Sequence, residues 1–183
     1  MVVAEQHRWV MDTSTYTHLC RAGHSDIIRS LAPAGVVLIP TDVSTEIETG
    51  RDRYSDIPSV SSIDWAEVAV LTEEEVWTQL EVKAQMGGQS VEHLGECAVI
   101  ACAYHRKLIA ILDDRAALAQ AERLHVCTYD TMWIVIEAFK HLYGRDKNRT
   151  AQVVDDLLTT GMYLPVDSGE SIMSWAYEEG LLP

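Results

Sequence analysis

The chain has 183 residues, of which 48% are hydrophobic and 23% are charged, and this composition indicates a folded globular domain rather than a disordered segment. The formal net charge of −14 argues against a general nucleic-acid-binding module, because such modules usually present a basic face to phosphates. The same charge favours a basic protein partner. It leaves a metal-dependent nuclease open, since bound cations would supply positive charge at the site.

No apolar run approaches the roughly 18 residues of a membrane span, and no charged leader precedes an apolar stretch. We therefore expect a cytoplasmic protein. The cysteines stand in apolar or helical surroundings without CxxC spacing, which favours reduced thiols over a disulfide framework. They also lack the spacing of a zinc site with His18 or His24. The cysteines are Cys20, Cys97, Cys102 and Cys127.

The N-terminal segment predicts a strand followed by two helices. Residues 8–11 form a short apolar run that stops at Asp12, which places this carboxylate at the carboxyl end of the strand. Helices are expected over residues 15–22 and 25–32, because a glycine ends the first and a proline follows the second.

Residues 36–39 are continuously apolar, which is typical of a strand buried on both faces. The next helix is expected to open at Thr41 and to carry Glu46 on its second turn. Residues 51–64 are polar and read as a loop or a frayed helix. A further short strand is predicted over residues 68–71.

Two helices are predicted in the middle of the chain. Thr72 and Glu75 have the spacing of a capping box, and the helix that they start is expected to run to Met86. The second helix covers residues 94–103, whose small apolar side chains suit close packing against a sheet. Its first turn carries Glu96, where the helix dipole favours a carboxylate.

A strand over residues 108–112 ends just before Asp114, a helix follows over 116–123, and a last strand is predicted over 125–128. Strands that alternate with helices indicate an α/β fold, with three layers in which helices cover both faces of a central parallel sheet. Functional sites in such folds gather at the carboxyl ends of the strands. Asp12 and Asp114 are both predicted to lie there.

The C-terminal part predicts additional helices. Residues 132–143 follow helical spacing, which we interpret as a helix docked on the core. We divide the chain into a catalytic domain over residues 1–144 and an acidic helical extension over residues 145–183, packed on the same domain. Asp167 and Glu170 have the spacing that predicts the N-terminus of a final helix.

Carboxylates that end predicted strands or begin predicted helices are expected to lie close together, namely Asp12, Glu46, Glu96 and Asp114. Acids crowded without basic partners repel one another, and a bound divalent cation is the usual remedy. Taken singly, each has a plain alternative: Asp12 and Asp114 are equally explained as helix N-caps. Glu46 and Glu96 alone are more simply read as solvated helix positions. Their joint placement favours a metal site, with Asp42 and Asp113 as weaker candidates.

Four segments, over residues 10–14, 39–47, 94–101 and 111–115, contain these acids in order. Together they resemble the PIN domain, a nuclease family that includes the VapC-type toxins of bacterial toxin–antitoxin pairs. The resemblance covers about residues 8–130, and no single segment is specific alone.

This resemblance implies a metal-dependent endoribonuclease that uses Mg²⁺ or Mn²⁺. It implies catalytic roles for Asp12, Glu46, Glu96 and Asp114, of which Asp12, Glu96 and Asp114 would hold the metal. Ser14 and Asp113 would support these acids, and Arg115 is a weak candidate for a substrate contact.

Two features depart from the family pattern. Leu112 stands where many members have Thr or Ser, so a supporting hydrogen bond is either missing or supplied by Asp113. The acidic extension is also longer than usual. Other cations that could contact phosphates are Arg51, Arg53, Arg106, Lys107, Arg145, Lys147 and Arg149.

The sequence leaves three functions open. The first is an RNA-cleaving toxin silenced by a basic antitoxin. The second is a non-catalytic module of the same fold that binds a basic protein through its acidic surface. The third is a flap- or exonuclease-like enzyme acting on DNA, because metal chemistry at a phosphate does not choose the sugar. A homodimer is a further expectation, with Trp133 or the final helix supplying an apolar contact.

Overall fold

The computed structural model describes residues 8–89 and 91–183, and its centre is a parallel sheet. Five short strands pair in the order β3-β2-β1-β4-β5, and every pairing is parallel. This arrangement confirms the predicted α/β fold. The strands are β1 (Trp9–Met11), β2 (Val37–Pro40), β3 (Ala66–Ala69), β4 (Ile109–Ile111) and β5 (Thr128–Tyr129).

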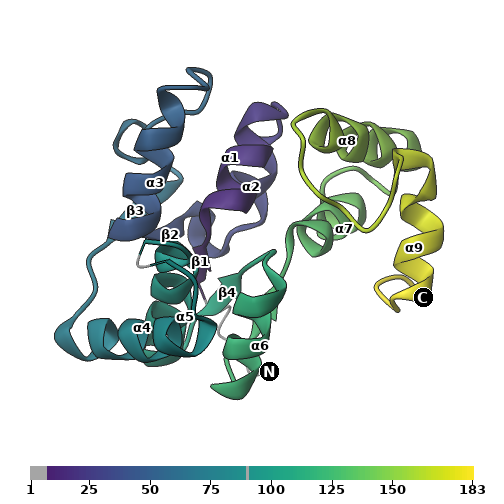
Figure 1. Ribbon diagram of the computed structural model, residues 1–183. Coiled ribbons are helices and arrows are strands. Elements are labelled where there is room, and N and C mark those ends of the chain that lie inside the picture. The colour runs from purple at the N-terminus through teal and green to yellow at the C-terminus, as the bar shows by residue number, and fades with distance from the viewer. Residues whose placement is uncertain (1–7, 90) are drawn as a thin grey trace.

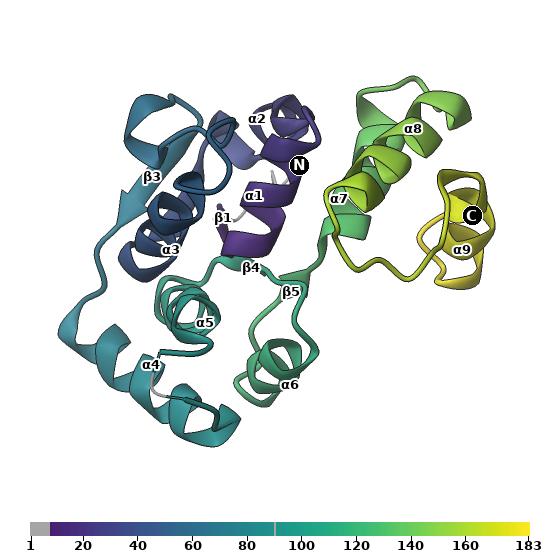
Figure 2. The same ribbon diagram turned by 45° about the horizontal axis from the view of Figure 1, so that its top comes forward.

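Helices lie on both sides of the sheet, as Figures 1 and 2 show. The chain moves in one direction from β1 to β3 and in the other direction from β4 to β5. Right-handed crossovers therefore place the two sets of helices on opposite faces. One face carries α1 (Thr13–Arg21), α2 (Ser25–Leu31) and α3 (Thr41–Arg51), and the other carries α4 (Glu73–Met86), α5 (Leu94–Arg106) and α6 (Arg115–Arg123).

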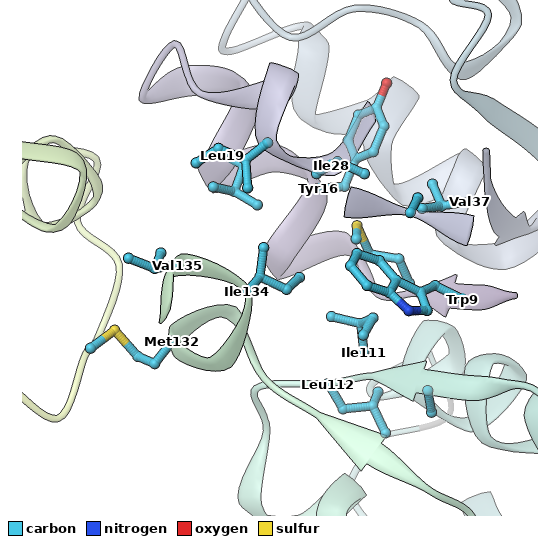
Figure 3. Packing of buried hydrophobic residues seen from close by; sticks show 14 of the residues in the cluster. Trp9, Tyr16, Leu19, Ile28, Val37, Ile111, Leu112, Met132, Ile134 and Val135 are labelled. Carbon is cyan, nitrogen blue, oxygen red and sulfur yellow. The ribbon is translucent and has the colours of Figure 1, made fainter. Parts of the chain in front are cut away.

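Long apolar runs form the core of the sheet. Every residue of β1 and β2 is buried, as the continuous apolar runs predicted. Ala98, Ala101 and Cys102 of α5 are fully buried, and such small side chains let the helix pack closely against β1, β2 and β4. Figure 3 shows side chains of the sheet and of α1 and α2 meeting those of α7 (Thr131–His141).

Two edge strands differ from the prediction. β3 begins two residues before the predicted start at residue 68, and β5 begins at Thr128 instead of residue 125. Pairing with β2 sets the position of β3 along the chain. The apolar side chains of Val68 and Val70 are exposed and are not part of the core. For β5, the reason is the backbone of His125, whose φ of 55° is not an extended conformation. The strand therefore cannot begin at residue 125.

The C-terminal helices are α8 (Lys147–Thr159) and α9 (Ile172–Glu178), which follow α7. The predicted cap at Asp167 is wrong, because a 3₁₀ turn, η3 (Gly169–Ser171), precedes α9, whose start has no side-chain cap. The backbone N–H of Gly169 instead donates to Oδ1 of Asp155 at 2.6 Å. A Cβ on Gly169 would come within 2.0 Å of the backbone of Ala151, so η3 lies directly against α8.

Apolar residues of α8 belong to the same buried cluster as the strands, among them Val153, Val154 and Leu157. The boundary between residues 144 and 145 stays a prediction. The remaining 3₁₀ turns are η1 (Pro33–Gly35) and η2 (Val60–Ser62). Among the described residues, no helix has both the length and the apolar character needed to cross a bilayer.

Candidate active site

Asp12 directly follows β1 and is only 3% exposed. Its Oδ1 accepts a hydrogen bond from the backbone N–H of Thr15 at 2.9 Å, which makes Asp12 the N-cap of α1. Its Oδ2 accepts from the backbone N–H of Asp113 at 3.3 Å. β1 and β4 are direct neighbours, with Met11 opposite Ile111, so the two strands deliver both acids to one edge of the sheet.

The electrostatic environment of Asp12 is unfavourable to its charged form. Burial raises the pKa of Asp12 well above its ordinary value, and the nearby charge of Asp113 raises it further. Hydrogen bonds from Thr15 and from the Asp113 backbone act in the opposite direction without cancelling these effects. A buried acid that is only partly compensated is typical of functional sites.

Asp113 connects the site to two threonines. Its Oδ2 accepts hydrogen bonds from the hydroxyls of Thr15 (3.1 Å) and Thr131 (2.8 Å), and its Oδ1 accepts from the backbone N–H of Thr131 (2.9 Å). The two threonine hydroxyl oxygens also lie 3.0 Å apart, within hydrogen-bond distance, so their two hydrogens are shared among these three contacts. Leu112 is fully buried in the core and has no polar side chain. The supporting hydrogen bonds in this segment therefore come from its neighbour Asp113.

Glu46 joins three helices at the side of the site. One oxygen accepts from the backbone N–H of Gly95 at 3.1 Å, and the other accepts from the hydroxyl of Thr13. Gly95 and Thr13 are the neighbours of Glu96 and Asp12 in the chain. Burial raises the pKa of Glu46, and the charge of Glu96 raises it further, although the Thr13 hydroxyl lowers it. Glu46 therefore fixes the positions of the segments that carry two other acids.

A cavity of about 800 Å³ lies at this edge of the sheet, and we call it the acidic cavity. One side, the carboxylate wall, consists of Asp12, Glu96, Asp113 and Asp114. Ser14 and Arg115 also line the cavity, so all predicted site residues except Glu46 and the weaker candidate Asp42 lie on it. Asp114 is the N-cap of α6, because its Oδ1 accepts from the backbone N–H of Ala117 at 2.8 Å.

A protein-family model matches nearly the whole chain. The model of the DUF3368 family, described as a PIN domain, matches residues 8–178. The chain belongs to the PIN domain family. The matched range includes both α8 and α9. A comparison with curated proteins gave no significant match. PIN domains are generally nucleases, so the family gives the acidic cavity a chemical context.

The acids of this PIN domain fit a hard divalent cation by their chemistry. Within residues 8–89 and 91–183, no three Asp, Glu, His or Cys side chains lie close enough together to enclose a metal ion. Asp12, Glu96 and Asp114 nevertheless line one cavity, and Mg²⁺ and Mn²⁺ prefer carboxylate oxygens as ligands. None of the three forms an ion pair with Lys or Arg in the described part of the chain. Their charge is available to a cation.

The opposite side of the acidic cavity was not predicted from the sequence. The C-terminal wall, as we call it, consists of residues 162–165 together with Trp175 and Glu179. Asp130 also lines the cavity and caps α7, accepting from the backbone N–H of Trp133 at 2.7 Å. A correctly placed β5 would have revealed Asp130, because it directly follows that strand. No sequence pattern indicated that the residues of the C-terminal wall would line this cavity.

Most cations of the PIN domain have structural partners. Arg106 forms two hydrogen bonds, of 2.6 and 2.8 Å, with Glu75, which is 1% exposed. Burial acts to raise the pKa of Glu75, but the hydrogen bonds from Arg106 and from the Thr72 backbone outweigh it, so the pKa is lowered. The predicted capping box of Thr72 and Glu75 is also confirmed. Arg106 is thus engaged in joining α4 to α5, and Arg115 is the cation that lines the acidic cavity.

Proposed function

We propose that this PIN domain is a divalent-metal-dependent endoribonuclease and the toxin of a type II toxin–antitoxin pair. The observation that supports it best is the carboxylate wall, in which the acids that follow β1 and β4 line one cavity with an acid of α5. Two unrelated helix caps, Asp12 and Asp114, would have no reason to share a cavity with two further acids. Burial of Asp12 beside Asp113 has an energetic cost that a bound cation would offset.

The position of each residue suggests its role in the proposed reaction. Asp12, Glu96 and Asp114 would hold Mg²⁺ or Mn²⁺, and Asp113 would orient Asp12 through its backbone N–H. Glu46 would act from outside the cavity by holding Gly95 and Thr13 in place. A divalent cation at this site supplies an activated water and neutralises charge on the phosphoryl oxygens.

Single-residue variants test this proposal. Asp12→Asn and Asp114→Asn should each lower Mg²⁺- or Mn²⁺-dependent cleavage of RNA by about 100-fold or more, since ligands matter at least as much as the residues that orient them. The exposed Asp52 is remote from the acidic cavity, and Asp52→Asn should cleave normally. RNA that stays intact with both metals, or equal cleavage by all variants, would refute the assignment.

The toxin role rests on charge. A chain with a net charge of −14 and an acidic cavity is suited to a basic antitoxin segment. The gene beside this one should encode a small basic protein, and adding that protein should inhibit RNA cleavage in a salt-sensitive manner. A purified complex that cleaves RNA as fast as the free chain would argue against this role.

A non-catalytic module that binds a basic protein is the second candidate. It is favoured by the absence, within the described residues, of three groups already arranged around an ion position. Isothermal titration separates the two functions. Divalent binding that disappears in Asp12→Asn and Asp114→Asn supports the nuclease, and no divalent binding to the unaltered chain supports the module.

A further inference from the structure

A second cavity, which we call the aromatic cavity, adjoins the acidic one. It has a volume of about 360 Å³ and lies between β5, α7 and the C-terminal helix. The two cavities share four lining residues, Leu118, Asp130, Trp175 and Glu179. They are therefore parts of one continuous depression rather than separate sites.

The aromatic cavity is lined by fixed rings. Trp133 stacks on Tyr129, with ring centroids 3.8 Å apart and an angle of 8° between the planes. The edge of the same indole meets Trp9, with centroids 5.8 Å apart. Trp133 is therefore held on two sides by its own chain. Trp175 is half-buried, lines both cavities and takes part in no ring pair within the described residues.

A third cavity, of about 420 Å³, follows and shares Leu181 with the aromatic cavity. Its lining includes Lys140, Arg145 and Lys147 but no carboxylate side chain, in a chain of net charge −14. Lys140 is bonded to Glu137, whereas Arg145 and Lys147 form no ion pair among residues 8–89 and 91–183. We call it the basic cavity. Its free charges favour an anionic ligand.

We propose that the aromatic cavity is a base-binding subsite for single-stranded RNA, whose scissile phosphate lies at the carboxylate wall and whose next phosphates reach Arg145 and Lys147. This inference rests on the proposed ribonuclease function. The acids, the half-buried ring of Trp175 and the free cations follow one another along these cavities, as the phosphates and bases of one flexible strand would require. Stacking on an aromatic ring accepts any base, and a groove of positive charge holds the backbone. A duplex would keep its bases stacked on each other and could not use the cavity.

The test measures binding rather than cleavage. A labelled single-stranded RNA is titrated with the full chain and followed by fluorescence anisotropy, once with Ca²⁺ in place of Mg²⁺ and once in EDTA, and the strand is checked on a gel. Trp175→Leu keeps an apolar side chain but removes the ring, and should weaken binding by about 5- to 150-fold. Trp175→Phe should recover part of the loss. Duplex RNA should bind more weakly and respond to neither change.

Matched variants separate the site from the rest of the surface. Trp77 of α4 is 62% exposed and lies outside these cavities, so Trp77→Leu should bind single-stranded RNA normally. Changing Arg145 and Lys147 together to Ser should lower the slope of log affinity against log salt by about 1.4. The same change at Lys83 and Arg123, which line none of these cavities, alters the net charge equally and should leave that slope unaltered.

Each outcome bears on the inference or on the nuclease proposal. Binding that is equal in Trp175→Leu and the unaltered chain overturns the subsite, even where RNA is cleaved. A basic peptide that loses affinity in Trp175→Leu while RNA does not would make the cavity a protein-docking site and also overturn it. Single-strand binding that depends on Trp175, without cleavage in any buffer, supports the subsite and removes the nuclease proposal.

Discussion

The two walls of the acidic cavity are held by different kinds of interaction. The carboxylate wall is fixed by hydrogen bonds, since Asp12 and Asp113 together accept from backbone N–H groups and threonine hydroxyls. The C-terminal wall depends on the packing of η3 against α8, and Tyr163 within it is 86% exposed. Directional hydrogen bonds hold the acids in one geometry, whereas the C-terminal wall is held mainly by apolar packing, in which Met162 and Leu164 are buried, and by the bond from Gly169 to Asp155. The acids therefore lie on the wall that directional bonds fix.

Gly169→Ala should have the largest effect on the C-terminal wall. The new Cβ would overlap the backbone of Ala151, and we expect a loss of about 3 kcal/mol in the free energy of unfolding or a local release of η3 and α9. Chemical denaturation and limited proteolysis would distinguish these results. Gly50→Ala meets nothing within 4 Å, and should instead stabilise α3 by about 1 kcal/mol. Equal stability of the two variants would show that the η3 contact does not hold this wall.

Thr131→Val tests the carboxylate wall. It removes a hydroxyl that bonds to both Asp113 and Thr15 at a fully buried position, so the free energy of unfolding should fall by about 1–3 kcal/mol. RNA cleavage should fall as well, because Asp113 would no longer be held against Asp12. Thr159→Val removes a hydroxyl from the exposed side of α8 and should change neither quantity appreciably. Normal cleavage by Thr131→Val would show that this wall does not need its hydrogen-bond network.

The pH dependence of stability should show how much the burial of ionised Asp12 and Glu46 destabilises the fold. Burial raises the pKa of both Asp12 and Glu46, so the folded chain binds these protons more tightly than the unfolded chain. Their contribution to stability is fully present below their ordinary values and is lost as the pH rises through the folded ones. In EDTA, the contribution of these two acids to the free energy of unfolding should therefore decline as the pH rises from about 4.

Mg²⁺ should restore part of this loss at neutral pH, because it binds the ionised acids of the folded state. The double variant Asp12→Asn with Glu46→Gln controls for the general negative charge of the chain, and its profile in EDTA should be flatter. A profile as steep as that of the unaltered chain would assign the pH dependence to other groups.

Tyr163→Ser should have the smallest effect on stability. Its side chain is 86% exposed, so the free energy of unfolding should change by less than about 0.5 kcal/mol. Tyr163 lines the acidic cavity, and KM for RNA should nevertheless rise. An unchanged KM would remove Tyr163 from the substrate path and leave Trp175 as the aromatic ring of the C-terminal wall that contacts RNA.

Much of the carboxylate wall could be predicted because its helix caps depend on residues that are close together in the sequence. Asp12 and Asp114 each accept a hydrogen bond from a backbone N–H three residues later. The capping box of Thr72 and Glu75 has the same spacing. Asp12 and Asp114 are at once helix caps and cavity residues, so their role as caps does not exclude the predicted role in a metal site.

The sequence by itself determined the alternation of strands and helices, the buried runs of β1 and β2, and the acids that end β1 and β4. Tertiary structure decided which contacts those acids make: Asp113 bonds to Thr15, 98 residues away, and Glu46 bonds to Gly95, 49 residues away. It also set the limits of the edge strands and created the C-terminal wall. The reason is that caps and apolar runs arise from near neighbours, whereas a cavity needs segments that only the packed sheet brings together.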